Sequence, residues 1–302
     1  MNQVTIKNDF ISLSVLDYGA IIQRLEVKDR EGNPINVVVG FEEPEKYLAD
    51  NKSLGACIGR YAGRISNGSF NIDGTDFPLY SVNGVHLHGG REGFGKRTWT
   101  ITEVDNGKVP FIVLTYLSKD MEEGYPGNLT VTLTYKLIGP SLHIVHQART
   151  DRATPVNLTN HSYFNLDGGR QLDHYDLKMP CPYYIELDQE LIPTGNIVSV
   201  ADTELDFRSP KKIGGTRFDT PFVLEPALPF NTLLSSQRSG ISMEVITDQP
   251  AMVVYTPPEF ASICFETQNY PDAPNRPSFP NSLLYPGETY NNTTEYKFGF
   301  VI

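Results

Sequence analysis

Two polar stretches of the chain carry groups suited to acid–base chemistry. The first, SICFETQNYPD (262–272), has one glutamate, Glu266, inside a run with the composition of a β-strand. Because side chains alternate across a strand, we expect Cys264 and Glu266 on one face and Ile263 and Phe265 on the other. Carboxylates are rarely buried without a partner, and one held on a strand among hydrogen-bond donors is positioned to act as a general base.

The second stretch, TPVNLTNHSYFNLDG (154–168), holds a histidine within a dense set of neutral hydrogen-bonding groups. A lone histidine is more often a structural residue than a catalyst, but such a density of donors and acceptors suits a polyhydroxylated ligand. Histidine is also the side chain best able to exchange protons near neutral pH. We interpret His161 as a candidate acid in a set that comprises Asn157, Thr159, Asn160, His161, Ser162, Tyr163 and Asn165.

Two further stretches offer charged groups that could bind a ligand. GRYAGRISNG (59–68) contains Arg60 and Arg64. An arginine in a β-rich loop is usually a solvated surface charge, but a guanidinium can also donate planar hydrogen bonds to substrate oxygens. In FDTPFVLEP (218–226), Asp219 precedes an apolar run, and on its own it is more typical of a turn or of the start of a strand than of a binding site.

A fifth stretch, NGVHLHGG (83–90), raises the question of a metal. His86 and His88 would lie on the same face if the segment were extended, but a metal needs further histidine or carboxylate ligands. His143 and His146 are three residues apart, which places them on opposite faces of a strand. We therefore predict no metal site. The two glycines that end the stretch indicate a close approach of the backbone to a ligand or to a neighbouring strand.

Composition and motifs exclude several classes of protein. The net charge of −11 disfavours nucleic acids and anionic membranes as partners. The sequence has no GxGxxG after a strand, no GxxxxGK[ST] and no GxSxG motif. Its three cysteines are far apart and form no CxxC pair, so neither a disulfide framework nor a zinc knuckle is indicated. No signal peptide or apolar run of about 18 residues is evident, and we expect a reduced, cytoplasmic setting.

The elements that must position these groups are predicted to be strands. Residues 129–137 alternate apolar and polar side chains, and 10–15 and 241–246 repeat the pattern. Asp73-Gly74 and Asn106-Gly107 separate such runs and favour tight hairpin turns with positive φ. The best helix candidate, 42–51, is short. The pattern predicts an all-β protein, one large antiparallel β-sandwich in which residues 1–302 form a single domain.

These stretches resemble the aldose 1-epimerase (galactose mutarotase) family. The matching segments run in order from about residue 55 to the C-terminus: GRYAGRI, LHGGREGFGKRTW, EEGYPGNLTVTLTY, TPVNLTNHSYFNLDG, FETQNYPDAPNRPSFP and LYPGETYNNTTEYKF. The resemblance implies a galactose-mutarotase-like supersandwich that interconverts the α and β anomers of free aldohexoses such as galactose and glucose, without a cofactor. It places the catalytic base on Glu266, the catalytic acid on His161, and substrate-binding groups on Arg64, His88 and Asp219.

The chain departs from the family pattern at three points. It has Gly63 where asparagine often precedes the binding arginine, and Arg276 where histidine is frequent. From Asp219 on it reads DTPF, where the family commonly has Asp-His-Asn-Phe or Asp-Asp-Asn-Phe. Three alternative functions stay open at this stage. They are a hexose-6-phosphate 1-epimerase, a non-catalytic carbohydrate-binding β-sandwich, and a glycoside hydrolase that uses Glu266 and Asp219 as its carboxylate pair. The preferred hexose and the oligomeric state are not encoded in any pattern that we find.

Overall fold

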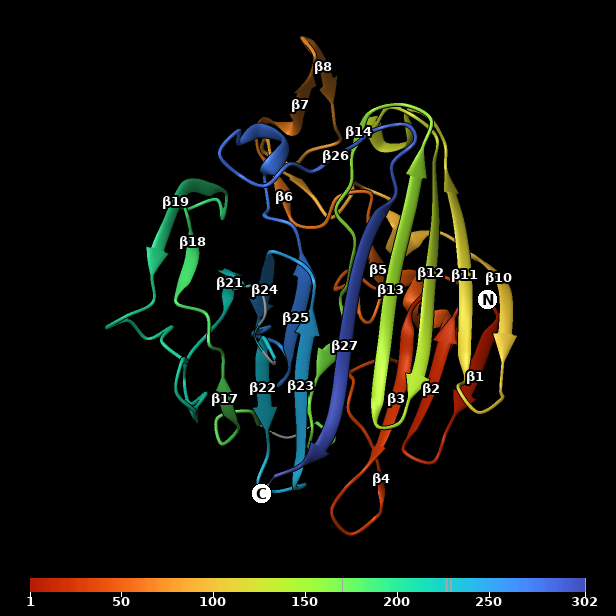
Figure 1. The fold of residues 1–302 in the computed structure, drawn as a ribbon, viewed down its shortest axis with the longest axis vertical. Coiled ribbons are helices and arrows are strands. Elements are labelled where there is room, and N and C mark those ends of the chain that lie inside the picture. Colours follow the sequence, from red (N-terminus) through yellow and green to blue (C-terminus); the bar gives the residue numbers. More distant parts are fainter. Residues whose placement is uncertain (170, 226–227, 229, 302) are drawn as a thin grey trace.

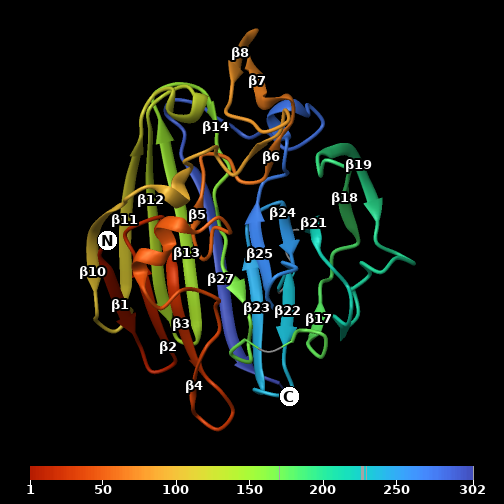
Figure 2. The ribbon, with the colours of Figure 1, turned by 180° about the vertical axis from the view of Figure 1, so that it is seen from behind.

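The fold is built almost entirely from antiparallel strands, as the alternating sequence pattern predicts. The computed structural model describes residues 1–169, 171–225, 228 and 230–301. Figure 1 shows long strands that run side by side and a second group of strands that lies against them, and Figure 2 shows the same arrangement from behind. The predicted all-β sandwich is confirmed.

The largest sheet forms one layer of the sandwich. Among the described residues it contains nine strands, and its central members are long. In spatial order these are β10 (Thr100–Asp105), β11 (Phe111–Ser118), β12 (Leu129–Ile138), β13 (Ser141–Thr150), β27 (Tyr290–Phe300), β23 (Ile241–Thr247), β22 (Thr232–Ser235), β17 (Asp176–Lys178) and β20 (Lys211–Lys212).

Two smaller sheets form the opposing layer. Within the described ranges, one has six strands in the order β16 (Tyr163–Phe164), β25 (Ile263–Gln268), β24 (Ala251–Tyr255), β21 (Asp219–Val223), β18 (Tyr183–Leu187) and β19 (Pro193–Ser199). The other has four, in the order β1 (Gln3–Lys7), β2 (Ile11–Leu16), β3 (Ile22–Lys28) and β4 (Pro34–Asn36).

Short strand pairs and single helical turns connect the layers. The pairs are β5 (Cys57–Ile58) with β15 (Thr159–Asn160), β6 (Arg64–Ile65) with β9 (His86–Leu87), β7 (Ser69–Ile72) with β8 (Thr75–Pro78), and β14 (Thr154–Pro155) with β26 (Leu283–Leu284). The 3-10 turns are η1 (Pro44–Ala49), η2 (Ser66–Gly68), η3 (Phe94–Lys96), η4 (Glu122–Gly124) and η5 (Ala273–Asn275). In the described part of the chain, no helix has both the length and the apolar character needed to cross a membrane.

The hydrophobic core lies between the layers, and β25 shows how it fixes the site. Ile263 and Phe265 belong to this core, and the Phe265 carbonyl accepts a hydrogen bond from the hydroxyl of Tyr296 on β27. Cys264 lies in a second apolar cluster on the opposite side of the strand. The predicted division of β25 into two faces is therefore confirmed, and Glu266 occurs on a strand that is buried on both sides.

The strand predictions are confirmed, and one of the two turn predictions is wrong. The stretches 10–15, 129–137 and 241–246 coincide with β2, β12 and β23. Asp73 and Gly74 form the predicted tight turn, with φ values of 50° and 82°. Asn106-Gly107 does join two strands, but neither residue is among those with positive φ. A longer connection, 106–110, spreads the reversal over more residues, and the amide of Gly107 donates instead to Asp105 Oδ1.

Candidate active site

One pocket collects all five site residues that the sequence predicted. It has a volume of about 240 Å³ and opens to solvent between the ends of the small strand pairs and the six-stranded sheet. The five residues come from five separate parts of the chain: Arg64 from β6, His88 from the turn after β9, His161 from the turn after β15, Asp219 from the start of β21, and Glu266 from β25.

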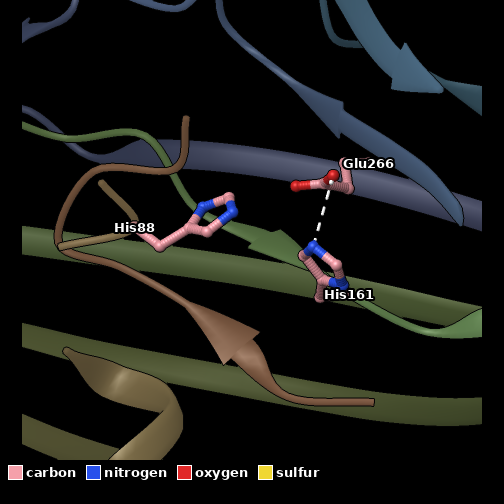
Figure 3. A group of neighbouring side chains, drawn as sticks. All are labelled: His88, His161 and Glu266. Carbon is pink, nitrogen blue, oxygen red and sulfur yellow. Dashed lines mark ion pairs between the residues drawn. The ribbon is translucent and has the colours of Figure 1, made fainter. Parts of the chain in front are cut away.

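Glu266 and His161 form a close, buried pair at the inner end of this pocket. The Nε2 atom of His161 lies 3.4 Å from Oε1 of Glu266, and the two side chains are 5% and 4% exposed. Figure 3 shows both groups pointing toward a common space that the ring of His88 also faces. Oε2 of Glu266 is buried and has no protein partner within the described residues, so it is free to accept a hydrogen bond from a ligand.

Burial moves the pKa values of this pair in opposite directions. It raises the pKa of Glu266 to about 8, to which the charge of Asp219 contributes and which the charge of Arg64 opposes. It lowers the pKa of His161 to about 4. Between those values the pair holds one dissociable proton, either on Glu266 beside a neutral imidazole or on His161 beside a carboxylate. A pair of this kind can take a proton from one oxygen and give one to another.

Arg64 and Asp219 form a second pair on the wall of the pocket. Nη2 of Arg64 lies 3.7 Å from Oδ2 of Asp219, and both side chains are partly exposed. Burial raises the pKa of Asp219, and the guanidinium counteracts that effect. The buried Asp272 holds the backbone of β6, because its amide donates to the carbonyl of Arg64 and its carboxylate accepts from Arg276 Nε. Arg276, one of the departures from the family pattern, therefore supports the strand that carries Arg64.

His88 lies in the pocket because its backbone leaves the extended conformation. Its φ is 52°, and its Nδ1 accepts a hydrogen bond of 3.2 Å from the amide of Gly63. Gly63 itself has a φ of 81°, a region that glycine adopts without strain. The segment is therefore not extended through His88, so the condition under which His86 and His88 would share one face is not met. His86 is buried and bonded to the hydroxyl of Tyr125 and to a backbone carbonyl.

The donor set of His88, His161 and Glu266 has the composition of a metal site, which sequence spacing did not anticipate. Their ligand atoms lie within 4.8 Å of one another. A metal-binding histidine normally donates its other N–H to an acceptor. Nδ1 of His88 instead faces the N–H of Gly63, which places the ring proton of neutral His88 on Nε2. If Nε2 of His88 bound a metal, the ring proton would have to lie on Nδ1, where it would face the N–H of Gly63. The three side chains therefore fit a sugar hydroxyl better than a metal.

The polar stretch 154–168 contributes less to the pocket than we expected. Only His161 and Tyr163 of its seven polar residues are among the described residues that line the pocket. Asn157 and Asn160 bond to backbone groups instead: Asn157 to the carbonyl of Ala62 and the amide of Asn269, and Asn160 to the carbonyl of Gly55. These amides hold the loops that carry the site residues, because each offers both a donor and an acceptor to buried backbone groups.

Arg60 also differs from the expectation of a solvated surface charge. It is 2% exposed, and its guanidinium donates to the carbonyls of Pro126, Gly127, Ser118 and Lys119. Burial lowers the pKa of Arg60 to about 10. Its function is to join the loop before β6 to the connection between β11 and β12, away from the pocket.

Several residues that line the pocket carry no signal in the sequence. Leu187 and Leu191, at the β18–β19 connection, and Val253 and Tyr255 on β24 form an apolar wall beside the polar groups. Apolar side chains are so common in strands that their composition could not distinguish them from the core. The adjoining 51–53 segment is polar, and only its place shortly before the GRYAGR stretch could have suggested a role.

Comparisons with known proteins agree with this architecture. The sequence profile described as aldose 1-epimerase matches residues 2–297. The human galactose mutarotase is 39% identical over 97% of this chain and 92% of its own length. The aldose 1-epimerase of Escherichia coli (strain K12) is 32% identical over 98% and 94%. A crystal structure of an aldose epimerase homologue from C. elegans covers 100% of this chain and 99% of its own, with a TM-score of 0.94 and 28% identity.

A crystal structure of a galactose 1-epimerase from Lactobacillus acidophilus NCFM is also similar, with a TM-score of 0.89 and 29% identity over 99% of this chain and 95% of its own. The similarity thus extends over nearly the full length of the chain in both sequence and fold. The chain belongs to the aldose 1-epimerase family of isomerases.

Proposed function

We propose that the protein interconverts the α and β anomers of free aldohexoses, with galactose and glucose as the first substrates to test. The observation that carries the proposal is the buried His161–Glu266 pair, 3.4 Å apart, at the inner end of a pocket with neutral and charged hydrogen-bonding groups. Opening a hemiacetal ring requires that the proton of the C1 hydroxyl be removed and that a proton be delivered to the ring oxygen. A positioned acid–base pair does both.

The proposed reaction uses the one dissociable proton that His161 and Glu266 share. Glu266, as the carboxylate, accepts the proton of the C1 hydroxyl through Oε2, while His161 donates from Nε2 to the ring oxygen. The open-chain aldehyde turns about the C1–C2 bond and closes on its other face. Each group then returns its proton, by microscopic reversibility. Each such proton transfer contributes typically ~10²–10⁴-fold to the rate.

The remaining three residues hold the sugar in register with this pair. Arg64 and Asp219 offer a donor and an acceptor side by side, and His88 offers an Nε2–H. A fixed geometry of this kind lowers the activation barrier, because the translational and rotational entropy needed to align the reacting oxygens with the acid and the base is lost on binding. The apolar wall suits the C–H faces of a pyranose.

The cations of the pocket favour a neutral sugar over a hexose 6-phosphate. Among the described residues that line the pocket, the cationic side chains are Arg64 and Lys52. Arg64 is paired with Asp219, and Lys52 is paired with Glu259. A phosphate would lie beside these carboxylates, and the protein carries a net charge of −11, which disfavours anions.

Polarimetry of freshly dissolved α-D-galactose and α-D-glucose tests the proposal. Wild type should speed the decay of optical rotation, and Glu266→Gln and His161→Asn should each reduce the rate constant by about 10²–10⁴-fold. Glu244→Gln and His143→Asn, which change partly exposed residues on the large sheet, are matched controls that should behave as wild type. No acceleration by wild type would refute the proposal for free hexoses.

Three further arms separate the alternatives. A decay that is faster for hexose 6-phosphates than for free hexoses would favour the phosphosugar enzyme. Release of reducing sugar from a disaccharide would favour a glycoside hydrolase. Sugar binding by wild type without turnover would indicate a carbohydrate-binding protein. Glu266→Gln distinguishes binding from catalysis, because the amide keeps the shape of the carboxyl group but is no base.

We also propose that residues 1–302 act as one domain in a cytoplasmic setting, without nucleic acid or membrane as a partner. The buried, unpaired thiols of the three cysteines suit a reducing environment. The negative net charge suits neutral small-molecule substrates. Cell fractionation with an antibody would test the location.

A further inference from the structure

The two histidines of the pocket differ in what faces their Nδ1 atoms. Nδ1 of His88 accepts the N–H of Gly63, a backbone group that can only donate. Nδ1 of His161 faces Sγ of Cys264 at 3.7 Å, and a thiol can donate or accept, weakly in either case. The two rings are 5.4 Å apart and nearly perpendicular. They share one pocket (Figure 3) but are held by partners of different chemistry.

This difference decides which ring can exchange protons. An imidazolium that gives up its Nε2 proton becomes the tautomer with a proton on Nδ1, so Nδ1–H needs an acceptor throughout the cycle. The N–H of Gly63 opposes a proton on Nδ1 of His88 and makes His88 a fixed Nε2–H donor. Nδ1 of His161 meets no such obstacle.

We propose that Cys264 is the positioning residue of His161, whose Nδ1–H its sulfur accepts, so that Nε2 of His161 is the atom that exchanges the proton with the sugar. The catalytic meaning of this contact rests on the proposed interconversion of anomers. Cys264 is fully buried, two residues before Glu266 on the same face of β25. It therefore acts on the reaction through His161 and through the strand that also carries the base.

Among the described residues, the other side chains around His161 do not offer an equivalent acceptor at Nδ1. Glu266 faces Nε2, and His88 presents its ring at a right angle. Tyr163 packs its ring at 4.9 Å, and its hydroxyl donates to a backbone carbonyl elsewhere. The carbonyl of His161 accepts the N–H of Gly55 and also interacts with its own ring, so it assists at Nδ1 as a backbone group. The sulfur of Cys264 is thus the side-chain atom that the structure places at Nδ1.

A thiol in this place also keeps His161 a strong acid. A carboxylate at Nδ1, as in a Ser-His-Asp triad, stabilises the imidazolium and raises its pKa. Burial, together with the nearby charge of Glu266, raises the pKa of the Cys264 thiol well above its usual range, so this neighbour stays uncharged. An acid whose Nδ1 partner adds no charge suits donation to a ring oxygen, because an ether oxygen is a weak base.

The first test measures the tautomers of the wild-type protein directly. Long-range ¹H–¹⁵N correlation spectra of histidine-labelled protein at pH 7 distinguish Nδ1–H from Nε2–H, and His161→Asn and His88→Asn assign the two signals. We expect Nδ1–H for His161 and Nε2–H for His88. An Nε2–H tautomer for His161 overturns the proposal. The readout is independent of activity, so its failure is separate from a failure of wild type to accelerate mutarotation.

The second test changes the thiol. Cys264→Ala should reduce the preference for Nδ1–H by up to about tenfold and lower kcat by about three- to tenfold, with KM nearly unchanged. Cys264→Ser keeps an acceptor, so it should retain the tautomer, and its better-accepting hydroxyl should move the acid limb of the kcat–pH profile to higher pH. Cys181→Ala, which removes another buried thiol, is the matched control and should change none of these values.

Two outcomes contradict the proposal. One is a Cys264→Ala variant with an unchanged tautomer and an unchanged acid limb, since a merely structural thiol would give that result. The other is a serine variant whose acid limb moves to lower pH. Where the alanine variant does not fold, the wild-type spectrum and the serine variant decide the question.

Discussion

Glu266→Gln should remove catalysis and at the same time stabilise the protein at alkaline pH. The pKa of Glu266 is raised from an ordinary 4.5 to about 8 in the folded state. The folded protein therefore holds this proton more tightly than the unfolded chain, and stability falls as pH rises from 4.5 toward 8. At 1.36 kcal/mol per pH unit, the loss over that interval amounts to about 5 kcal/mol. Glutamine has no proton to lose, so the variant escapes this loss.

The assay is unfolding of both proteins in urea at pH 6 and at pH 9, with thermal unfolding alongside. The variant should gain about 3 kcal/mol over wild type between the two pH values, because about 2 kcal/mol of the loss has already occurred at pH 6. For a chain of this size we expect the Tm of the variant relative to wild type to rise by about 5 °C between pH 6 and pH 9. Glu244→Gln, on the partly exposed face of β23, should show no such trend. A stability difference between Glu266→Gln and wild type that is equal at both pH values would refute the reasoning.

Three further predictions follow from the same pocket. The kcat of wild type, measured by polarimetry, should be constant between about pH 4 and about pH 8 and should fall on both sides, because only the singly protonated His161–Glu266 pair is active. A kcat that changes steadily through neutral pH would contradict this. Asp219→Asn should move the basic limb of the kcat–pH profile to lower pH, and Arg64→Met should move it to higher pH, because Asp219 raises and Arg64 lowers the pKa of Glu266. Shifts of both variants in the same direction would contradict this. Gly63→Ala, at a φ of 81°, should displace the amide that holds His88 and raise KM by roughly tenfold, with kcat less affected; unchanged saturation curves would show that the turn tolerates a side chain.

The strands could be predicted because burial on one face imposes a period of two. In β12, five alternating apolar side chains enter the core, and that pattern needs no tertiary information. The pairing of β13 with β27 could not be predicted in this way, because these strands are more than a hundred residues apart and many strands of similar composition compete. The Asn106-Gly107 turn failed for a related reason: a connection with extra residues is not obliged to adopt the two-residue geometry.

Glu266 and His161 could be singled out from the composition of their stretches, whereas Arg64, His88 and Asp219 were assigned to the site only through the family resemblance. Composition alone assigned Arg60 and Arg64 the same surface role, yet one is buried against carbonyls and the other lines the pocket. Spacing put His86 and His88 on one face, and the positive φ of His88 separates them. What no sequence pattern expresses is the partner of each ring nitrogen, which distinguishes a fixed donor from a proton carrier.

The opposite displacement of the two pKa values has burial as its main cause, and it makes the resting pair unreactive. With the proton on Glu266 and a neutral His161, neither the base nor the acid is ready. A bound sugar changes this, because its C1 hydroxyl donates to Oε2 and stabilises the carboxylate, while its ring oxygen accepts from Nε2–H and stabilises the imidazolium. The substrate itself thus draws the proton from Glu266 to His161. Both anomers carry these two oxygens, so the same transfer prepares the pair for either direction of the reaction, and a sugar analogue without the C1 hydroxyl would leave the proton on Glu266.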